Sequence, residues 1–296
     1  MKIITVTLNP CIDVSYRMDK PFEAGELNRV DMGKLRYSGK GINVSRRLSQ
    51  LGTESLIITF SFGEDGDKME KELRREGLSV WAVKANGRLR RNVAILDSDG
   101  RATEINEKGS PITEENIKEL VGVLKSELNC PDSKILIISG SIPAGVDADI
   151  YRKLCKVGRN SGALVVLDCD GEALKKGLEA TPDLIKPNRR ELEELTGVDL
   201  SMSGEEARIE AVRAALEFFR NEETAVLCTL DCDGAVYAGP EGSYMCEAIK
   251  GDVKSFKGAG DSFLASFIRE IIVCDRDCET ALIKAAAETT QFLSGR

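Results

Sequence analysis

Residues 135–143 read Ile-Leu-Ile-Ile-Ser-Gly-Ser-Ile-Pro. Four consecutive apolar side chains are followed at once by small and polar residues of the kind that form turns. A run that is apolar on both faces, rather than alternating, is typical of a parallel strand buried between two layers of helices. The segment therefore predicts a strand over 135–139 in an α/β fold, with a polar turn at its carboxyl end.

The same pattern recurs along the chain. Apolar runs alternate with segments of helical periodicity, which is typical of a wound, mostly parallel sheet covered by helices on both faces. The other strands expected in this sheet are 3–8, 55–60, 79–83, 164–168, 183–185, 225–229 and 235–237. The expected helices are 42–51, 67–76, 113–128, 148–158, 189–196, 205–220, 261–273 and 279–293.

Two regions do not fit the wound sheet. Polar and apolar residues alternate in them, which predicts antiparallel strands with one solvated face. The tripeptide Ser98-Asp99-Gly100 predicts a hairpin turn in the second region. We therefore expect a single domain over 1–296 with a small β-sheet lid contributed from about 13–32 and 90–105. Its expected strands are 13–18, 27–32, 90–97 (with its apolar stretch at 93–96) and 101–105.

The composition excludes several classes of partner and of catalytic group. The chain of 296 residues has a formal net charge of −8 and no histidine. An acidic balance argues against nucleic acid or an anionic membrane as partner. Without histidine there is no His-based triad and no His-ligated zinc, so acid–base work falls to Asp, Glu, Lys, Tyr or Cys. Nine cysteines without a Cys-x-x-Cys pair indicate reduced thiols, and no apolar run has membrane-spanning length, so we expect a cytoplasmic protein.

The stretch Gly258-Ala259-Gly260-Asp261 precedes an apolar helical pattern. Small residues let the backbone turn tightly and expose its N–H groups, and the following helix adds unpaired donors and a positive dipole end. This combination predicts an anion-binding turn. The carboxylate of Asp261 at its edge can accept a proton from a nearby hydroxyl. Phosphoryl transfer to an alcohol needs both parts.

Polar residues also gather where the expected strands end. The carboxyl ends of parallel strands meet at one edge of a sheet, and ligands bind there. Any one of these segments is better explained as an ordinary turn, but together they indicate a site. The segments are Asn9-Pro10-Cys11-Ile12-Asp13, Gly140-Ser141-Ile142-Pro143, Cys169-Asp170-Gly171, and Lys186-Pro187-Asn188 with Glu191.

Five motifs, in this order, resemble the ribokinase-like sugar kinases of the PfkB type over nearly the whole chain. The resemblance implies a three-layer α/β sandwich with a mostly parallel central sheet and a β lid. The first two motifs most resemble the branch of 1-phosphofructokinases and tagatose-6-phosphate kinases. The motifs are Thr7-Leu8-Asn9-Pro10 with Asp13, Gly39-Lys40-Gly41-Ile42-Asn43-Val44, Ser139-Gly140-Ser141-Ile142-Pro143, Lys186-Pro187-Asn188 with Glu191, and Gly258-Ala259-Gly260-Asp261.

The resemblance implies phosphoryl transfer from ATP with Mg²⁺. Asp261 resembles the catalytic base, and the turn Gly258-Ala259-Gly260 would offer backbone N–H groups to the developing charge. Asn188 and Glu191 resemble the pair that orders Mg²⁺ through water, which suits an ion that keeps several of its waters. The residues implied for the nucleotide are Lys186, Asn188, Thr229, Asp231, Gly234 and Lys257.

The resemblance also implies a sugar-phosphate pocket. Arg29 and Arg90, with Lys40 nearby, would hold the phosphate of the substrate, a task suited to the planar fork of arginine. From the residues alone, Arg90 and its neighbours read equally well as a solvated charged turn. The implied substrate residues are Asp13, Arg29, Gly39, Lys40, Asn43, Arg90, Asn92 and Ser139.

We expect the reaction to be phosphorylation of fructose 1-phosphate at its 6-hydroxyl. Tagatose 6-phosphate, phosphorylated at its 1-hydroxyl, is the alternative that the sequence leaves open. A non-catalytic sugar-phosphate sensor is an alternative of another class. It is motivated by Asp231, where the family usually has glycine, and by Phe256 before the catalytic turn. A carboxylate at 231 would repel ATP phosphates, and Lys257 would offset it. Exposed lid strands invite pairing with a second copy, and the resemblance implies such a homodimer.

Overall fold

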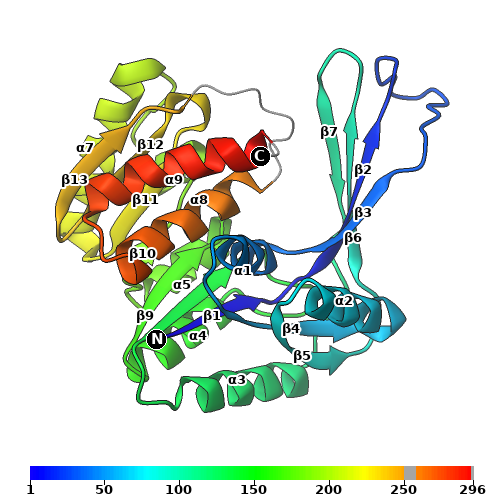
Figure 1. Ribbon diagram of the computed structural model, residues 1–296, viewed down its shortest axis with the longest axis horizontal. Helices are drawn as coiled ribbons and strands as arrows, with labels where there is room; N and C mark the ends of the chain where they lie inside the picture. The colour runs from blue at the N-terminus through cyan, green and yellow to red at the C-terminus, as the bar shows by residue number, and fades with distance from the viewer. Residues whose placement is uncertain (250–257, 295–296) are drawn as a thin grey trace.

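The computed structural model describes residues 1–249 and 258–294. Within these ranges its strands form a nine-stranded sheet and a smaller second sheet (Figure 1). The strands of the large sheet are β1 (Lys2–Thr7), β4 (Leu56–Phe62), β5 (Ser79–Ala85), β8 (Lys134–Ser139), β9 (Ala163–Asp168), β10 (Leu184–Ile185), β11 (Ala225–Thr229), β12 (Ala235–Gly239) and β13 (Gly242–Cys246).

The order in this sheet is β13-β12-β11-β10-β9-β8-β1-β4-β5. Neighbours from β11 to β5 pair in parallel, and β12 pairs antiparallel with both β11 and β13. The mostly parallel sheet predicted from the buried apolar runs is confirmed.

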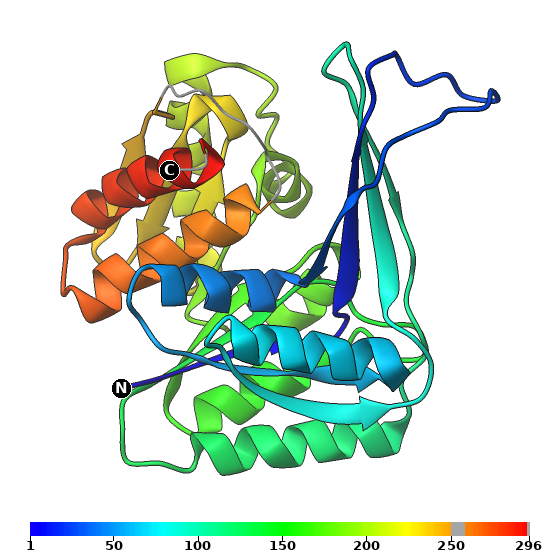
Figure 2. The ribbon, with the colours of Figure 1, turned by 45° about the vertical axis from the view of Figure 1, so that its right-hand side comes forward.

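Helices cover both faces of the sheet (Figures 1 and 2). On one face, α1 (Lys40–Gln50), α8 (Ala259–Ile268) and α9 (Cys278–Leu293) share a buried apolar cluster with the strands. On the other face, α3 (Glu114–Leu128), α4 (Ile150–Asn160) and α7 (Gly204–Glu222) share a second cluster. The remaining helical elements are α2 (Gly63–Arg75), α5 (Gly171–Leu178), α6 (Arg189–Thr196), the 3₁₀ turn η1 (Asp231–Asp233) and the π-helical turn η2 (Arg269–Val273).

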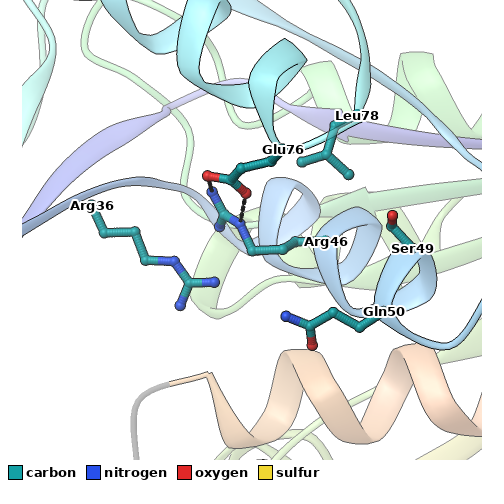
Figure 3. Close-up of a pocket in the computed structure, with 6 residues that line it drawn as sticks. All are labelled: Arg36, Arg46, Ser49, Gln50, Glu76 and Leu78. Atoms are coloured by element: carbon teal, nitrogen blue, oxygen red, sulfur yellow. Dashed lines mark hydrogen bonds and ion pairs between the residues drawn. The ribbon is translucent and has the colours of Figure 1, made fainter.

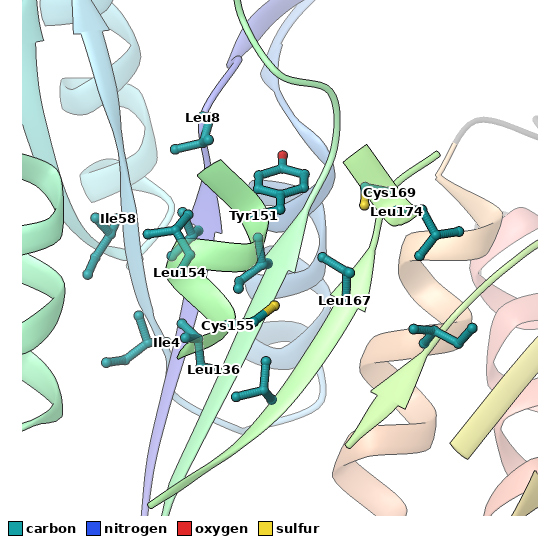
Figure 4. Close-up of a cluster of buried hydrophobic side chains, with 14 of the residues drawn as sticks. Ile4, Leu8, Ile58, Leu136, Tyr151, Leu154, Cys155, Leu167, Cys169 and Leu174 are labelled. Carbon is teal, nitrogen blue, oxygen red and sulfur yellow. The ribbon is translucent and has the colours of Figure 1, made fainter. Parts of the chain in front are cut away.

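The second cluster shows how the layers are held together (Figure 4). Tyr151, Leu154 and Cys155 of α4 lie against Leu136 of β8 and Leu167 of β9, and all five are fully buried. Burial of an apolar side chain of this size stabilises the fold by ~1.5–3 kcal/mol relative to exposure. The Tyr151 hydroxyl donates to the carbonyl of Gly140 at 2.9 Å, so the same packing supports the turn that follows β8.

The second sheet, which we call the lid, has the order β3-β2-β6-β7. β2 and β6 pair in parallel, and the two outer pairs are antiparallel. The lid strands follow β1 and β5 in the chain, so the lid stands at the carboxyl edge of the large sheet (Figure 1). They are β2 (Cys11–Arg17), β3 (Lys34–Ser38), β6 (Arg90–Leu96) and β7 (Ala102–Asn106).

One predicted lid strand is wrong. The strand expected over 27–32 is β3, Lys34–Ser38, and residues 27–32 belong to the loop before it. In that loop the Asn28 side chain accepts from the Glu23 N–H at 3.1 Å and donates to the Glu23 carbonyl at 2.7 Å. Such local side-chain bonds satisfy the backbone in place of a strand ladder.

Two local predictions are confirmed. The turn at Ser98-Asp99-Gly100 joins β6 to β7, and Asp97 Oδ1 accepts from the N–H groups of Asp99 and Arg101 at 3.0 and 2.9 Å. Thr113 caps α3 by accepting from the Asn116 N–H. Both are side-chain-to-backbone bonds within a few residues, which local sequence can specify.

Three features differ from the predicted elements. α5 begins at Gly171, where a loop was expected, and β13 extends the sheet beyond β12. The first four residues of β13 alternate between half-buried and exposed and only Cys246 is buried, so the strand lacks the apolar run that marks the inner strands. The helix expected over 261–273 begins at Ala259 and changes to a π-helical turn at Arg269.

No disulfide joins the nine cysteines, all of which lie in the described residues: six are buried, Cys130 and Cys274 are half-buried, and Cys232 is exposed. Across residues 1–249 and 258–294, no helix combines the length and the apolar character needed to cross a membrane.

Candidate functional site

The turn that the sequence predicts to bind an anion lies at the amino end of α8. Gly258 caps the helix in the left-handed region, with φ 78°. A Cβ built on Gly260 would lie 3.3 Å from Lys186 Nζ, so the turn and this lysine approach closely. Helix donors and an ammonium group therefore face one space, which suits an anion.

Asp261 lies in the first turn of α8 and is 8% exposed. Its Oδ2 accepts from Asn43 Nδ2 of α1 at 2.9 Å. Burial and the negative charge of Asp168 raise the pKa of Asp261 to about 6, against the opposing effects of the Asn43 hydrogen bond and the charges of Lys40 and Lys186. A carboxylate with a raised pKa is suited to exchange a proton.

Asp168, at the end of β9, joins two of the predicted lysines. Its Oδ1 lies 3.2 Å from Lys40 Nζ and 3.3 Å from Lys186 Nζ. Burial alone would raise the pKa of Asp168, but the charges of Lys186 and Lys40 outweigh it and hold the pKa below its ordinary value. The same contact raises the pKa of Lys40. Lys40 is thus held charged, and the Nζ atoms of both lysines lie beside the end of β9.

Two buried polar atoms at this edge have no hydrogen-bond partner within the described residues: Ser139 Oγ and Asp168 Oδ2. Ser139 and Asp168 are direct register partners at the carboxyl ends of β8 and β9. Buried polar groups are nearly always satisfied, so atoms left open here fit a site that takes a ligand.

The amino end of α1 is set by glycines that let it approach β1. A Cβ on Gly39 would lie 2.6 Å from Thr7 Cγ2, and one on Gly41 would lie 2.6 Å from Thr7 Oγ1. Thr7 Oγ1 accepts from the Ile42 N–H at 3.1 Å. Gly39 thereby acts through packing, and it brings Lys40 and Asn43 to the site.

One face of the lid is polar. Asp13 of β2 is the register partner of both Arg36 of β3 and Asn92 of β6, so the three side chains share a face. Asn92 Nδ2 donates to Asp13 Oδ1 at 3.2 Å. Arg90 donates to Asn92 Oδ1 at 3.0 Å and to the carbonyls of Asn9 and Glu107. All three acceptors of Arg90 are neutral oxygens, so no carboxylate among the described residues pairs with its charge.

Arg88 and Arg91, the neighbours of Arg90 in the chain, both contact a carboxylate. Arg88 forms a two-pronged ion pair with Glu107, at 2.8 and 3.1 Å, and the Arg91 N–H donates to the same carboxylate. Arg88 is therefore neutralised at an exposed turn. The charged-turn interpretation suits Arg88, and the anion-binding interpretation suits Arg90.

Arg29 lies in the exposed loop that joins β2 to β3. This loop extends away from α1 and α8 at the far end of the lid (Figures 1 and 2). The fold therefore does not gather Arg29 with Arg90 and Lys40 in the way the resemblance implied, and its role stays a prediction.

The Asn188–Glu191 pair forms a reciprocal cap on α6. Asn188 Oδ1 accepts from the Glu191 N–H at 2.9 Å, and Glu191 Oε2 accepts from the Asn188 N–H at 2.8 Å. Glu191 is buried, and the cap uses only one of its two carboxylate oxygens. Thr229 lies beside this pair through a bridge with Asn188.

Asp231 and Gly234 flank the turn after β11. Asp231 is exposed with φ 54°, a left-handed conformation that glycine adopts more easily and Asp tolerates. A Cβ on Gly234 would lie 2.0 Å from the Cys246 carbonyl, so packing requires this glycine. Lys257 and Phe256 lie outside the described residues.

Within the described part of the chain, no group of three or more His, Cys, Asp or Glu side chains is arranged to hold a metal directly. The donor set nevertheless suits Mg²⁺ held through water: the buried carboxylate of Glu191 and the amide of Asn188 are oxygen donors at the strand ends.

Three residues of this region were not among the site residues predicted from the sequence. Asp168 was visible as the polar end of an apolar run, but its two lysine partners are distant in sequence. Arg36 was missed with the strand that carries it, although 34–38 alternates polar and apolar residues. Arg46, one turn after Asn43, donates to Asn43 Oδ1 at 3.1 Å, and no local pattern marks it.

The chain is similar to known proteins over most of its length. A family model described as pfkB family carbohydrate kinase matches residues 4–289. The 1-phosphofructokinase of Bacillus subtilis (strain 168) is 35% identical over 269 residues, which cover 91% of this chain and 85% of that protein.

Solved structures of other proteins have the same fold as this chain. The phosphofructokinase-2 of Escherichia coli in complex with fructose-6-phosphate superposes with a TM-score of 0.88 at 25% identity, over 99% of this chain and 93% of the other. A putative phosphofructokinase from Staphylococcus aureus superposes with a TM-score of 0.79 at 29% identity, over 99% and 92%. The predicted ribokinase-like fold is confirmed by these neighbours.

The buried lysine contacts of Asp168 predict a stability difference. Lys186→Met, which removes one of its two cations, should destabilise the fold by up to about 3–5 kcal/mol, as for a broken buried pair. Lys153→Met, which removes an exposed contact with Asp149, should cost less than about 1 kcal/mol. Denaturant unfolding at neutral pH measures both. Equal losses in the two variants would contradict the structural role given to the Asp168 contacts.

Proposed function

This chain belongs to the pfkB family of carbohydrate kinases and is a phosphotransferase, and we propose that its acceptor is a ketohexose monophosphate, with fructose 1-phosphate converted to fructose 1,6-bisphosphate. The observation that carries this proposal is buried Asp261 at the amino end of α8, beside two charged lysines and the polar face of the lid. The relative named 1-phosphofructokinase supports the choice of sugar. Tagatose 6-phosphate is the alternative, because both products carry a phosphate at each end.

In the proposed reaction Asp261 accepts the proton of the acceptor hydroxyl. A bond forms between that oxygen and the γ-phosphorus of ATP, the bond to the bridging oxygen breaks, and ADP leaves. The N–H groups of the turn Gly258-Ala259-Gly260 balance the charge on the moving group, together with Lys40 and Lys186. Removal of one comparable donor typically costs ~2.7–4 kcal/mol of barrier lowering.

ATP would place its phosphates at this turn and extend along the ends of β10 and β11. Lys186, Asn188, Thr229, Asp231 and Gly234 are the candidates there. Mg²⁺, ordered through water by Glu191 and Asn188, would supply neutralisation of the phosphate charge. Lys257 remains a candidate from the sequence.

The sugar phosphate would lie between the lid and the strand ends. Asp13 and Asn43 offer carboxylate and amide groups to its hydroxyls, and the Ser139 hydroxyl is an open partner. Arg90 would hold its phosphate, supported by Asn92. The lid would exclude water and so protect ATP from hydrolysis.

An ADP-release assay over hexose phosphates and free sugars tests the function. We expect turnover with fructose 1-phosphate or tagatose 6-phosphate, and its loss in Asp261→Asn with sugar-phosphate binding retained. Because the base must be ionised, kcat/KM should fall as the pH drops through about 6 and level off above it. Tight sugar-phosphate binding without any turnover would instead support the sensor, and turnover of free sugars alone would contradict the phosphate site.

Arg90→Met should raise the KM for the sugar phosphate by about 10- to 100-fold, because a charge-assisted hydrogen bond worth ~1.5–3 kcal/mol is lost. The KM for ATP should not change. Arg88→Met is the matched control, since Arg88 is already paired with Glu107 at the same exposed turn. Similar KM values for the two variants would place the phosphate elsewhere.

We also propose that the chain forms a homodimer through the apolar face of the lid. Leu35, Val14, Val93 and Ile105 are successive register partners across all four strands, so their side chains share a face. Leu35 and Ile105 are each 59% exposed. A continuous apolar row on an exposed sheet is stabilised when a second copy covers it.

Ile105→Asp should convert the dimer to a monomer, because it places a charge on the face that the second copy would cover. Light scattering coupled to gel filtration measures the mass. Ile283→Asp is the control, since Ile283 is 50% exposed on α9, away from the lid. A wild-type monomer at all concentrations, or an unchanged mass of Ile105→Asp, would refute the lid interface.

A further inference from the structure

The guanidinium of Arg46 lies where α1, the carboxyl end of α2 and lid strand β3 meet (Figure 3). The Arg46 residue is 5% exposed. Its Nε and Nη2 donate to the two carboxylate oxygens of Glu76 at 2.5 and 3.1 Å, and Nη2 also donates to the Tyr37 carbonyl of β3 at 3.0 Å. A two-pronged pair of this kind fixes the plane of the guanidinium.

The third guanidinium nitrogen of Arg46, Nη1, bonds the side chain that in turn contacts Asp261. Arg46 Nη1 donates to Asn43 Oδ1 at 3.1 Å, and the Ser38 hydroxyl donates to the same oxygen at 3.1 Å. Asn43 Nδ2 then donates to Asp261 Oδ2 at 2.9 Å. A continuous chain of hydrogen bonds therefore runs from Glu76 through Arg46 and Asn43 to Asp261.

The two donors at Asn43 Oδ1 are not equivalent. A hydroxyl can donate or accept, so Ser38 tolerates either orientation of the amide. A guanidinium has only donors, so Arg46 opposes the flipped amide, in which Nδ2 would face it. Arg46 is the group that makes Asn43 present an N–H, rather than an oxygen, to Asp261.

The orientation of the amide selects the state of Asp261. An N–H donor favours the carboxylate, whereas an amide oxygen in the same place favours the protonated acid, which can donate to it. With Oδ2 anchored by Asn43, the other oxygen of Asp261 is left for the acceptor hydroxyl.

We propose that Arg46, held by Glu76, is a positioning residue that sets the amide of Asn43 and thereby keeps Asp261 ionised and in place. The role of Asp261 as a base rests on the proposed function, but the control of the amide by Arg46 does not. The pocket of about 350 Å³ beside this pair is lined by Arg36, Arg46, Ser49, Gln50, Glu76 and Leu78.

The other charges near Asp261 come from separate elements. Asp168 of β9 opposes its ionisation, and Lys40 of α1 and Lys186 after β10 favour it. Arg36 of β3 also interacts with Asp261 across the lid face. Changes at Arg46 and Glu76 leave all four in the chain. Glu76→Gln removes a negative charge, which by itself would lower the Asp261 midpoint, so a rise in that variant can be assigned to the amide.

A direct titration tests the proposal. Carbon-13 NMR of aspartate carboxyl groups identifies Asp261 by the signal that Asp261→Asn removes. We expect Arg46→Met to raise the midpoint of this signal by about one pH unit and Glu76→Gln to raise it less. Arg75→Met is the matched control, because Arg75 is exposed on α2 and pairs only with Glu72 among the described residues; it should leave the midpoint unchanged.

Kinetics give a second readout. Arg46→Met should lower kcat by about 10- to 100-fold, because the base is misplaced, and should leave the KM for ATP unchanged. The acid limb of kcat/KM should move with the NMR midpoint, and Arg46→Lys, which keeps a donor without the fork, should lie between wild type and Arg46→Met.

The outcomes separate the hypotheses. Loss of stability in Arg46→Met with an unmoved Asp261 midpoint would leave Arg46 a purely structural residue and overturn the proposal. If Arg46→Met does not fold, unmoved midpoints in both Glu76→Gln and Arg46→Lys overturn it. If the wild type phosphorylates no sugar, the proposed function fails, and the NMR titration still decides the role of Arg46.

Discussion

The buried carboxylate of Asp168 is the constraint on which the site depends. A carboxylate removed from water without partners would cost several kcal/mol, so it requires cations. Lys40 and Lys186 supply them at 3.2 and 3.3 Å, from the start of α1 and the end of β10. Neutralising one charge therefore brings three elements together, and because Gly260 approaches Lys186, it also aligns the amino end of α8.

The two buried carboxylates of the site, Asp168 and Asp261, have pKa values that are shifted in opposite directions. The lysines hold the pKa of Asp168 below its ordinary value, so it stays ionised and keeps them in place. Asp261, with burial and the charge of Asp168 against it, has its pKa raised to about 6. Environments that push two carboxyl pKa values apart assign one to structure and the other to proton exchange. The hydrogen bond from Asn43 opposes this increase in the pKa of Asp261.

Local sequence predicts what depends on neighbours in the chain. Apolar runs such as 135–139 specified the parallel sheet, and because parallel strands end at one edge, the polar residues Ser139 and Asp168 lie side by side there. Ion pairs and hydrogen bonds between residues that are distant in the chain could not be predicted from the sequence. Arg88 and Arg90 read alike in sequence, yet Arg88 is neutralised by Glu107 and Arg90 has only neutral acceptors. The strand expected over 27–32 failed because the Asn28 side chain closes a loop there.

Strand β3 connects the lid to the base, and it was the strand placed wrongly from sequence. Its Ser38 hydroxyl and its Tyr37 carbonyl both take part in orienting Asn43, the second through Arg46. The same strand presents Arg36 beside Asp13 on the polar lid face. A lid position that changes the contacts of Asp13 must therefore also move the groups that orient Asn43. The proposed sugar contacts of the lid and the proposed orientation of Asn43 thus depend on the same strand.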